Sequence, residues 1–526
     1  MESPQGSRLI KNSVFLLFNT FFMMSTSWVI SIWITRQLGP SNYGIFNMVL
    51  WVSGTVCWVI AMGLTHATTR FIAEYNNDGK REYLRPILFY IIKIELVITL
   101  ISTAILIFFR TKISTFFFSP NESFYFFLAA IGLLPGIITA ILSSAIEGIQ
   151  KFEYFTYSNL IIAPLSFIGK ISVLLLGYGV TGLLTVVVAF SFVNMGFYYW
   201  VLSKEGLLKK NDTKLTTSIK EKIQNYNKSI MAILICDKIV WDKSENFFLG
   251  RYCDSVQIGY YNLGYNIAQR LTSILPTTFW KVLFPVMSSF NGTGSENKMR
   301  RLFYLSTRYI AFFSFPVGAA GIILSFHIVK YLYGIEYLGS QRVLQVILAA
   351  SVFSNLSGPA SAVLYGFDKQ AFIYKYGAVL AVINVCMDFF AIRAYGAIGA
   401  AICYGIITVI ASVGGLIYTC RTMKLKYPIV SIFKILFSTA LMSVVMKMVL
   451  MFVAGIPGLI FSFSMGIFVY VVSSLVLGDF EDEDFYILEH AKYAFPGKTK
   501  IIVDYAHTFF SQFRKSGLPG NSNLHS

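Results

Sequence analysis

Apolar runs of roughly twenty residues follow one another between residues 12 and 478, each long enough to cross a bilayer as a helix. Lipid offers no partners for backbone N–H and C=O groups, so an open chain crosses it only as helices. Charged residues make up 13% of the 526 residues, whereas a soluble domain carries about 25%. The sequence therefore predicts an all-α polytopic membrane protein.

Fourteen spans are expected from the apolar runs. Their predicted ranges are 12–35, 44–66, 85–109, 122–146, 154–176, 180–202, 228–250, 257–285, 302–326, 340–366, 371–393, 397–420, 428–452 and 456–478.

The basic residues of the loops predict the orientation of these spans. With the N-terminus in the cytoplasm, 26 basic residues lie in inside loops and tails, against 6 in outside loops. Such an excess is typical of cytoplasmic loops. We therefore expect a multi-pass protein of the cytoplasmic membrane with both termini in the cytoplasm. The net charge of +17 then follows largely from topology, and no nucleic-acid partner is predicted.

A turn motif occurs twice, as "LGPSNYG", which ends at Gly44, and as "LGRYCDSVQIG", which ends at Gly259, 215 residues later. A second pair, Gly148 and Gly366, is 218 residues apart, and a third, Gly179 and Gly396, is 217 apart. An offset that spans six helices gives two copies of the same orientation, which are parallel repeats as some transporters have.

The repeat and the loops divide the chain into segments. These are an N-terminal lobe 1–202 with helices 1–6, a basic cytoplasmic linker 203–227, a C-terminal lobe 228–420 with helices 7–12, helices 13–14 at 421–478, and a cytoplasmic tail 479–526.

The same segments resemble a known family. "RQLGPSNYG", "GLTHATTRFIAEY" and "SENFFLGRYCDSVQIGYYNLGY" are similar to the polysaccharide transporters, the Wzx-type oligosaccharide (O-antigen) flippases of the MOP superfamily. The resemblance covers about residues 8–478. It implies two pseudo-symmetric six-helix lobes in a V plus two C-terminal helices. It also implies flipping of an undecaprenyl-diphosphate-linked glycan by alternating access, with membrane lipids, polysaccharide polymerase and glycosyltransferases as partners.

Basic and polar residues inside the spans are the expected diphosphate-binding groups. A mid-bilayer charge is costly and usually faces a cavity or a partner. In the eighth span polar side chains recur every three or four residues and form one helical stripe. Arg holds phosphate oxygens bidentately and Lys acts as a point charge. The predicted cavity residues are Arg270, Lys170, Lys281, Lys93, Asn266 and Arg308. The alternative for each is an ion pair without substrate contact.

Carboxylates inside the spans are the expected coupling groups. Lys238, Asp242 and Glu245 share one face of the seventh span, and Asn384 and Asp388 are one turn apart in the eleventh. Glu245, Asp242 and Asp388 are therefore predicted to bind H⁺ or Na⁺, the alternative being a static Lys238–Asp242 pair. No P-loop and no HExxH motif occurs, so no cofactor and no enzyme activity is predicted.

Three other functions stay open. A cation-coupled multidrug exporter of the same superfamily would have a more acidic cavity. A glycan ligase or glycosyltransferase would need a large outside loop with catalytic residues, and none is present. A membrane subunit of a polysaccharide synthesis or export complex is compatible with the sequence.

Overall fold

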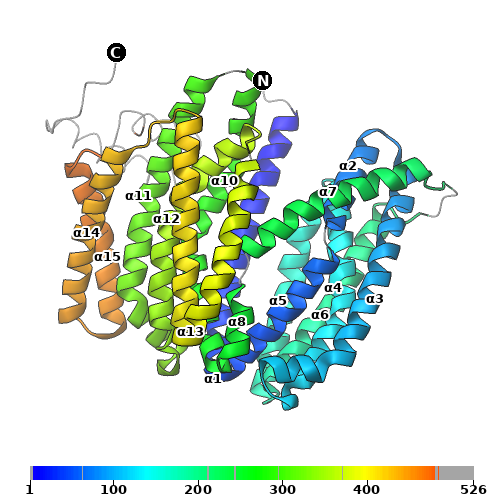
Figure 1. Ribbon diagram of the computed structural model, residues 1–526, viewed down its shortest axis with the longest axis horizontal. Coiled ribbons are helices and arrows are strands. Elements are labelled where there is room, and N and C mark those ends of the chain that lie inside the picture. Colours follow the sequence, from blue (N-terminus) through cyan, green and yellow to red (C-terminus); the bar gives the residue numbers. More distant parts are fainter. Residues whose placement is uncertain are drawn as a thin grey trace. The chain divides into compact units, whose positions relative to one another are not determined.

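The computed structural model describes residues 4–61, 63–209, 213–241, 244–293, 295–369, 371–479 and 484, which form helices and turns and no strand (Figure 1). Except for residues 479 and 484, the expected cytoplasmic tail 479–526 lies outside these residues. The helices are α1 (Pro4–Ile60), α2 (Leu64–Asn77), α3 (Leu84–Phe117), α4 (Ser123–Gly148), α5 (Glu153–Leu175), α6 (Gly179–Lys204), α7 (Thr217–Trp241), α8 (Glu245–Tyr252), α9 (Ser255–Thr272), α10 (Ile274–Thr293), α11 (Glu296–Ile328), α12 (Ser340–Gly366), α13 (Ala371–Thr422), α14 (Ile429–Phe452) and α15 (Gly455–Val476).

Ten helices in the described part of the chain are long and apolar enough to cross a membrane. Two of these, α1 and α13, contain 57 and 52 residues, more than twice the roughly 20 residues that one crossing needs. Each is kinked at a glycine with positive φ, Gly39 in α1 and Gly396 in α13, so each contains two spans. The predicted seventh and eighth spans fall on α7 with α8 and on α9 with α10, and the count of fourteen stays a prediction.

Each of the expected seventh and eighth spans is divided between two helices in the described part of the chain. α7 ends at Trp241 and α8 begins at Glu245, while α9 and α10 meet at Ser273. Pro276 explains the second break, because it has no N–H to donate to the Thr272 carbonyl four residues earlier. The Asn355 side chain of α12 donates to that carbonyl instead, at 3.1 Å.

A second proline leaves another backbone carbonyl of the helix without its donor, and this carbonyl anchors α15. Pro316 lies inside α11 and removes the helical donor of the Phe312 carbonyl. The Tyr470 hydroxyl of α15 donates to this carbonyl at 2.6 Å. Since an unpaired carbonyl in a membrane is costly, this bond gives α15 a defined position on α11.

The described chain groups into two compact units. Unit 1 comprises residues 1–265, 332–343 and 372–404, and unit 2 comprises 266–331, 344–371 and 405–526. This division differs from the lobes expected from the repeat, because α9 and α13 each contribute to both units. The lobe boundaries stay a prediction.

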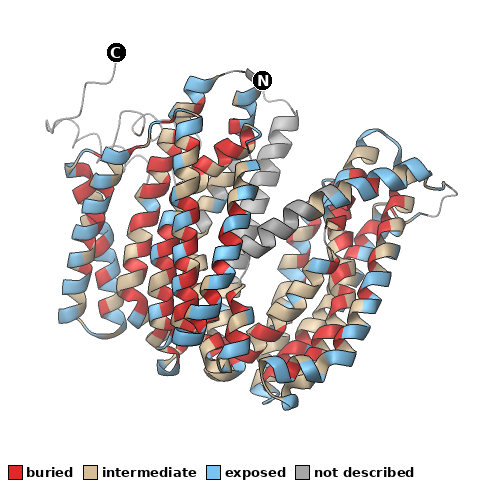
Figure 2. Ribbon diagram, in the orientation of Figure 1, coloured by how far each residue is buried: buried red, intermediate tan, exposed pale blue. Residues whose placement is uncertain are grey.

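Each unit has its own apolar core. In unit 1 a cluster joins α2, α3 and α4 through residues such as Phe71, Leu88 and Ile141. In unit 2 one cluster joins α10, α11 and α12, and another joins α11 to α14 and α15. Large apolar side chains are also exposed along many helices, for example on α3, α14 and α15 (Figure 2). Lipid is the solvent that such surfaces require.

The repeated turn motif forms a reciprocal backbone contact within unit 1. A Cβ added to Gly44 would overlap the Ser255 carbonyl oxygen, and a Cβ added to Gly259 would overlap the Pro40 carbonyl oxygen. Pro40 and Ser255 are separated by the same 215 positions as the two glycines. In each copy of the motif, a backbone carbonyl therefore packs against the glycine of the other copy, as in an isologous contact.

Substitution of either glycine should destabilise the protein. We expect Gly44→Ala or Gly259→Ala to lower the free energy of unfolding by about 1–3 kcal/mol, because the added methyl group overpacks a backbone contact. Gly54→Ala is the matched control, since a Cβ there meets nothing within 4 Å. Thermal unfolding in detergent measures the melting temperatures of these variants and of the Gly54→Ala control. Equal melting temperatures for the Gly44 and Gly54 variants would contradict the close approach.

Candidate functional site

A buried polar cluster in unit 1 is the candidate site. It lies where the N-terminus of α8 and the middle of α9 meet both halves of α13. Ser244 directly precedes α8 and Glu245 is its first residue, and the one-turn spacing of Asn384 and Asp388 puts both on one face of α13. Its members are Ser244, Glu245, Asn246, Tyr261, Asn262, Asn384, Asp388 and Cys403.

Ser244 links the two polar residues of α13. The Asn384 amide donates to the Ser244 hydroxyl at 3.0 Å, and this hydroxyl donates to the Asp388 carboxylate at 3.4 Å. The Cys403 thiol, on the second half of α13, lies beside the same carboxylate. Glu245 follows Ser244 directly, so two of the three predicted coupling carboxylates, Glu245 and Asp388, belong to one cluster.

A second set of contacts ties the cluster to α9. The Asn262 amide donates to the Asn246 side chain at 2.8 Å and to the Ile258 carbonyl at 3.0 Å. Tyr261 lies beside the Glu245 carboxylate. These contacts fix α8 against α9 in the neighbourhood of Glu245.

The carboxyl and amide groups of this cluster are buried, and some of their oxygens lack hydrogen-bond partners among the described residues. Asp388 is 0% exposed, Glu245 2% and Asn384 3%. One oxygen each of Asp388 and Asn384 has no hydrogen-bond partner among the described residues. A buried polar atom without a partner costs about 1–3 kcal/mol, and a proton or a hard cation that takes oxygen ligands would remove that cost. The described residues contain no group of three His, Cys, Asp or Glu side chains for a transition metal.

The predicted cations are distributed over several helices. Lys93 is exposed on α3, and Lys170 is half-buried in α5 with its ammonium 5.9 Å from the centre of the Phe167 ring. Asn266 and Arg270 are half-buried on the C-terminal half of α9. For Lys281 the structure describes only its place in α10. Their role in a diphosphate site stays a prediction.

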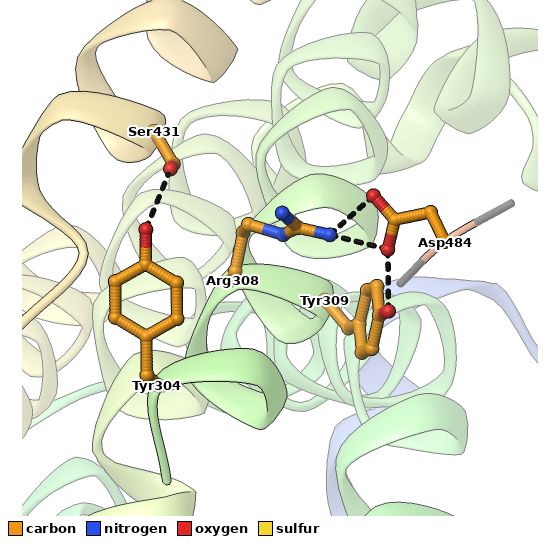
Figure 3. A network of polar contacts seen from close by, with 5 residues as sticks. All are labelled: Tyr304, Arg308, Tyr309, Ser431 and Asp484. Atoms are coloured by element: carbon orange, nitrogen blue, oxygen red, sulfur yellow. Dashed lines mark hydrogen bonds and ion pairs between the residues drawn. The ribbon is translucent and has the colours of Figure 1, made fainter. Parts of the chain in front are cut away.

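Arg308 has a partner within the chain. Its side chain is 3% exposed and forms an ion pair with both carboxylate oxygens of Asp484 (Figure 3). The Tyr309 hydroxyl donates to the same carboxylate, and Tyr304 contacts Ser431 of α14 nearby. In this conformation an acidic residue of the tail, rather than a ligand, compensates Arg308. Its predicted contact with substrate stays a prediction.

A second carboxylate lies close to this pair, just after α15. Burial raises the pKa of Asp479 to about 6, against the opposing effect of Lys434 and Arg308. Because the folded pKa is above the unfolded value, the stability that the neutral acid contributes is lost as pH rises through about 6.

Sequence reasoning missed several members of the cluster. Ser244 and Asn246 flank Glu245, and a polar run of three residues in an apolar span was the available signal. Cys403 gave no signal, because a lone cysteine in an apolar run is usually a small apolar filler. Asp242 lies outside the described residues.

A family model described as "Polysaccharide biosynthesis protein" matches residues 33–342. The chain belongs to this family. The ten candidate spans among the described residues agree with a multi-pass membrane protein.

Two proteins are similar to this chain in sequence. An "uncharacterized membrane protein in cps region" of Klebsiella pneumoniae is 24% identical over 257 residues, which are 48% of this chain and 50% of the relative. A "probable flippase AglR" of Haloferax volcanii is 21% identical over 387 residues, which are 71% of this chain and 75% of the relative. The chain thus spans half of the first relative's length.

The fold is that of MOP-superfamily transporters. The lipid II flippase MurJ in an inward closed conformation matches with a TM-score of 0.71 and 15% identity, covering 89% of this chain and 98% of the other. An inward-facing multidrug resistance MATE transporter matches with a TM-score of 0.63 and 14% identity, covering 78% and 94%. At these identities the likeness shows the fold alone.

Proposed function

We propose that this protein flips an undecaprenyl-diphosphate-linked oligosaccharide across the cytoplasmic membrane by alternating access. H⁺ or Na⁺ binding at the Asp388 cluster drives the cycle. Both termini lie in the cytoplasm, where glycosyltransferases assemble the glycan, and a polymerase on the other side of the membrane receives it.

The Asp388 cluster is the observation that carries this proposal. Ionisable residues deep in membrane spans commonly belong to ion or proton pathways. Asp388 is fully buried, and one oxygen of its carboxylate lacks a partner among the described residues. Binding a cation there and releasing it in another conformation would couple an ion gradient to movement of the helices.

Family membership supports the glycan part of the proposal. The family model carries a polysaccharide biosynthesis description, and one relative is named a probable flippase. A diphosphate needs fixed positive charge during transport, and Arg270, Lys170, Lys281, Lys93 and Asn266 are the proposed sources of charge and hydrogen bonds. Arg270 is the strongest of them, because its planar guanidinium binds two phosphate oxygens at once.

A multidrug exporter is the second candidate, since the fold of a MATE transporter also matches. An exporter of this kind would tolerate loss of Arg270, because organic cations gain nothing from a positive charge in the cavity. A subunit of a polysaccharide synthesis complex would tolerate it as well.

Arg270→Ala should abolish glycan export in cells that depend on this protein. The lipid-linked oligosaccharide should accumulate in the inner leaflet, because its diphosphate loses a cationic partner. Arg270→Lys should restore part of the export, since the charge remains but the bidentate geometry is lost. Surface glycan and inner-leaflet lipid are measured together.

Arg421→Ala is the control, because Arg421 is exposed in the last turn of α13. It should export like the wild type at equal expression. Normal surface glycan in well-expressed Arg270→Ala cells would remove Arg270 from the proposed site.

A further inference from the structure

Glu95 lies on the buried face of α3. The buried residues of this helix include Ile87, Leu88, Ile91, Glu95 and Thr99, and their three- to four-residue spacing defines one face. Glu95 is about 16 Å along the helix from Leu84 at 1.5 Å per residue, which is near the middle of a bilayer about 30 Å thick. A carboxyl group therefore occupies an otherwise uncharged helix face in the membrane interior.

Neither carboxyl oxygen of Glu95 has a hydrogen-bond partner among the described residues, and the side chain is 0% exposed. The Thr99 hydroxyl is committed to the Glu95 backbone carbonyl at 2.6 Å. Lys93 is exposed on α3, and residues two apart on a helix do not face each other. The neighbouring cation therefore does not neutralise Glu95.

Among the described residues, the helices packed against α3 place no ion pair or hydrogen bond on the Glu95 carboxyl group. Near the apolar cluster that they share with α3, the charged and titratable side chains of α1, α2 and α4 are Cys57, His66, Arg70, Glu74, Tyr75 and Glu147. On α7, Lys220 lies 5.8 Å from the Tyr90 ring centre, and on α8, Arg251 lies 5.0 Å from the Phe116 ring centre near the end of α3.

Most of these side chains pack against residues other than Glu95 or are exposed. Glu74 pairs with Lys222 at 2.7 Å, and the Arg70 guanidinium lies 4.4 Å from the Tyr226 ring centre. Tyr75 packs against the Tyr83 ring. His66 and Glu147 are exposed.

An ionised carboxylate in such a place would have an uncompensated charge, which is far more costly than a neutral buried acid. We propose that Glu95 is a proton-binding site in the N-terminal part of the chain, distinct from the Asp388 cluster, and that it exchanges its proton during transport. In the conformation described here the carboxyl group is neutral. The proton comes from the aqueous phase, bonds to one carboxylate oxygen, and returns to water when a conformational change hydrates the site.

Glu95→Gln tests the proposal in full-length protein reconstituted in liposomes, because the amide keeps the shape of the neutral acid but binds no proton. Infrared difference spectroscopy detects the carbonyl band of protonated carboxyl groups. At neutral pH the wild type should show a band component that Glu95→Gln lacks. Glu147→Gln, on the neighbouring helix, should retain it.

A flipping assay is the second test of proton exchange at Glu95, and this test rests on the proposed function. Acceleration of flipping by an imposed pH gradient should be lost in Glu95→Gln and kept in Glu147→Gln. Identical infrared bands in wild type and Glu95→Gln would overturn the proposal. A lost band with an unchanged gradient response would overturn it as well, because Glu95 would then be a static neutral acid.

If Glu95→Gln does not fold, Glu95→Met replaces it, because the Met side chain is of similar length and apolar. The same loss of the infrared band and of the gradient response is expected. If the wild type moves no lipid-linked glycan, the proposed function fails separately. The infrared comparison and a pH-gradient assay with an organic cation substrate then decide on Glu95.

Discussion

Asp388→Asn should uncouple flipping from the ion gradient. The amide preserves the shape of the side chain but removes the charge that would hold H⁺ or Na⁺ beside Ser244 and Asn384. Coupling free energies between two ligands are typically ~1–3 kcal/mol, or about 5–150-fold. We therefore expect the gradient-driven rate in proteoliposomes to fall by about tenfold or more. Glu245→Gln, in the same cluster, should reduce the response in the same direction.

Asp368→Asn is the matched control for this experiment. Asp368 is exposed in the turn after α12 and has a positive φ, a conformation that Asn also tolerates. This variant should respond to gradients as the wild type does. A wild-type gradient response in both Asp388→Asn and Glu245→Gln would exclude the cluster as the coupling site.

Arg308→Met should cause the largest loss of stability. The variant leaves the Asp484 carboxylate buried without its cation, and breaking a buried ion pair in this way costs about 3–5 kcal/mol. The double variant Arg308→Met/Asp484→Leu should recover most of the loss, because it removes both charges. Thermal unfolding in detergent measures the single and the double variants.

Arg300→Met provides the comparison on the same helix. Arg300 pairs with the exposed Glu296 at 3.0 Å, and an exposed pair of this kind contributes about 0.3–0.5 kcal/mol. Its melting temperature should therefore change little. Equal changes for Arg300→Met and Arg308→Met would contradict a buried pair between α11 and the tail.

Local patterns in the sequence predicted much of the fold and part of the site. The length of the apolar runs gave the spans, since bilayer thickness fixes helix length. The spacing of Gly44 and Gly259 indicated a repeat, and in the structure these glycines contact each other's motifs. Asn384 and Asp388 were predicted to share a helix face from their four-residue spacing.

Contacts between residues far apart in the sequence could not be predicted. Arg308 and Asp484 are 176 residues apart, and no periodic pattern relates α11 to the tail. Pro276 lies inside the expected eighth span, but a proline alone does not predict a break, because a proline in a membrane helix is tolerated where a neighbour replaces its hydrogen bond. That neighbour, Asn355, is identifiable only in three dimensions.

Transbilayer movement of the lipid itself tests the central proposal most directly. The purified protein is reconstituted in liposomes that carry a fluorescent polyprenyl-diphosphate-linked oligosaccharide, and its arrival in the opposite leaflet is followed under imposed pH and Na⁺ gradients. We predict movement that requires the wild-type protein, responds to at least one gradient, and loses that response in Asp388→Asn. Movement no faster than in protein-free liposomes, with transport of an organic cation by the same preparation, would contradict the account.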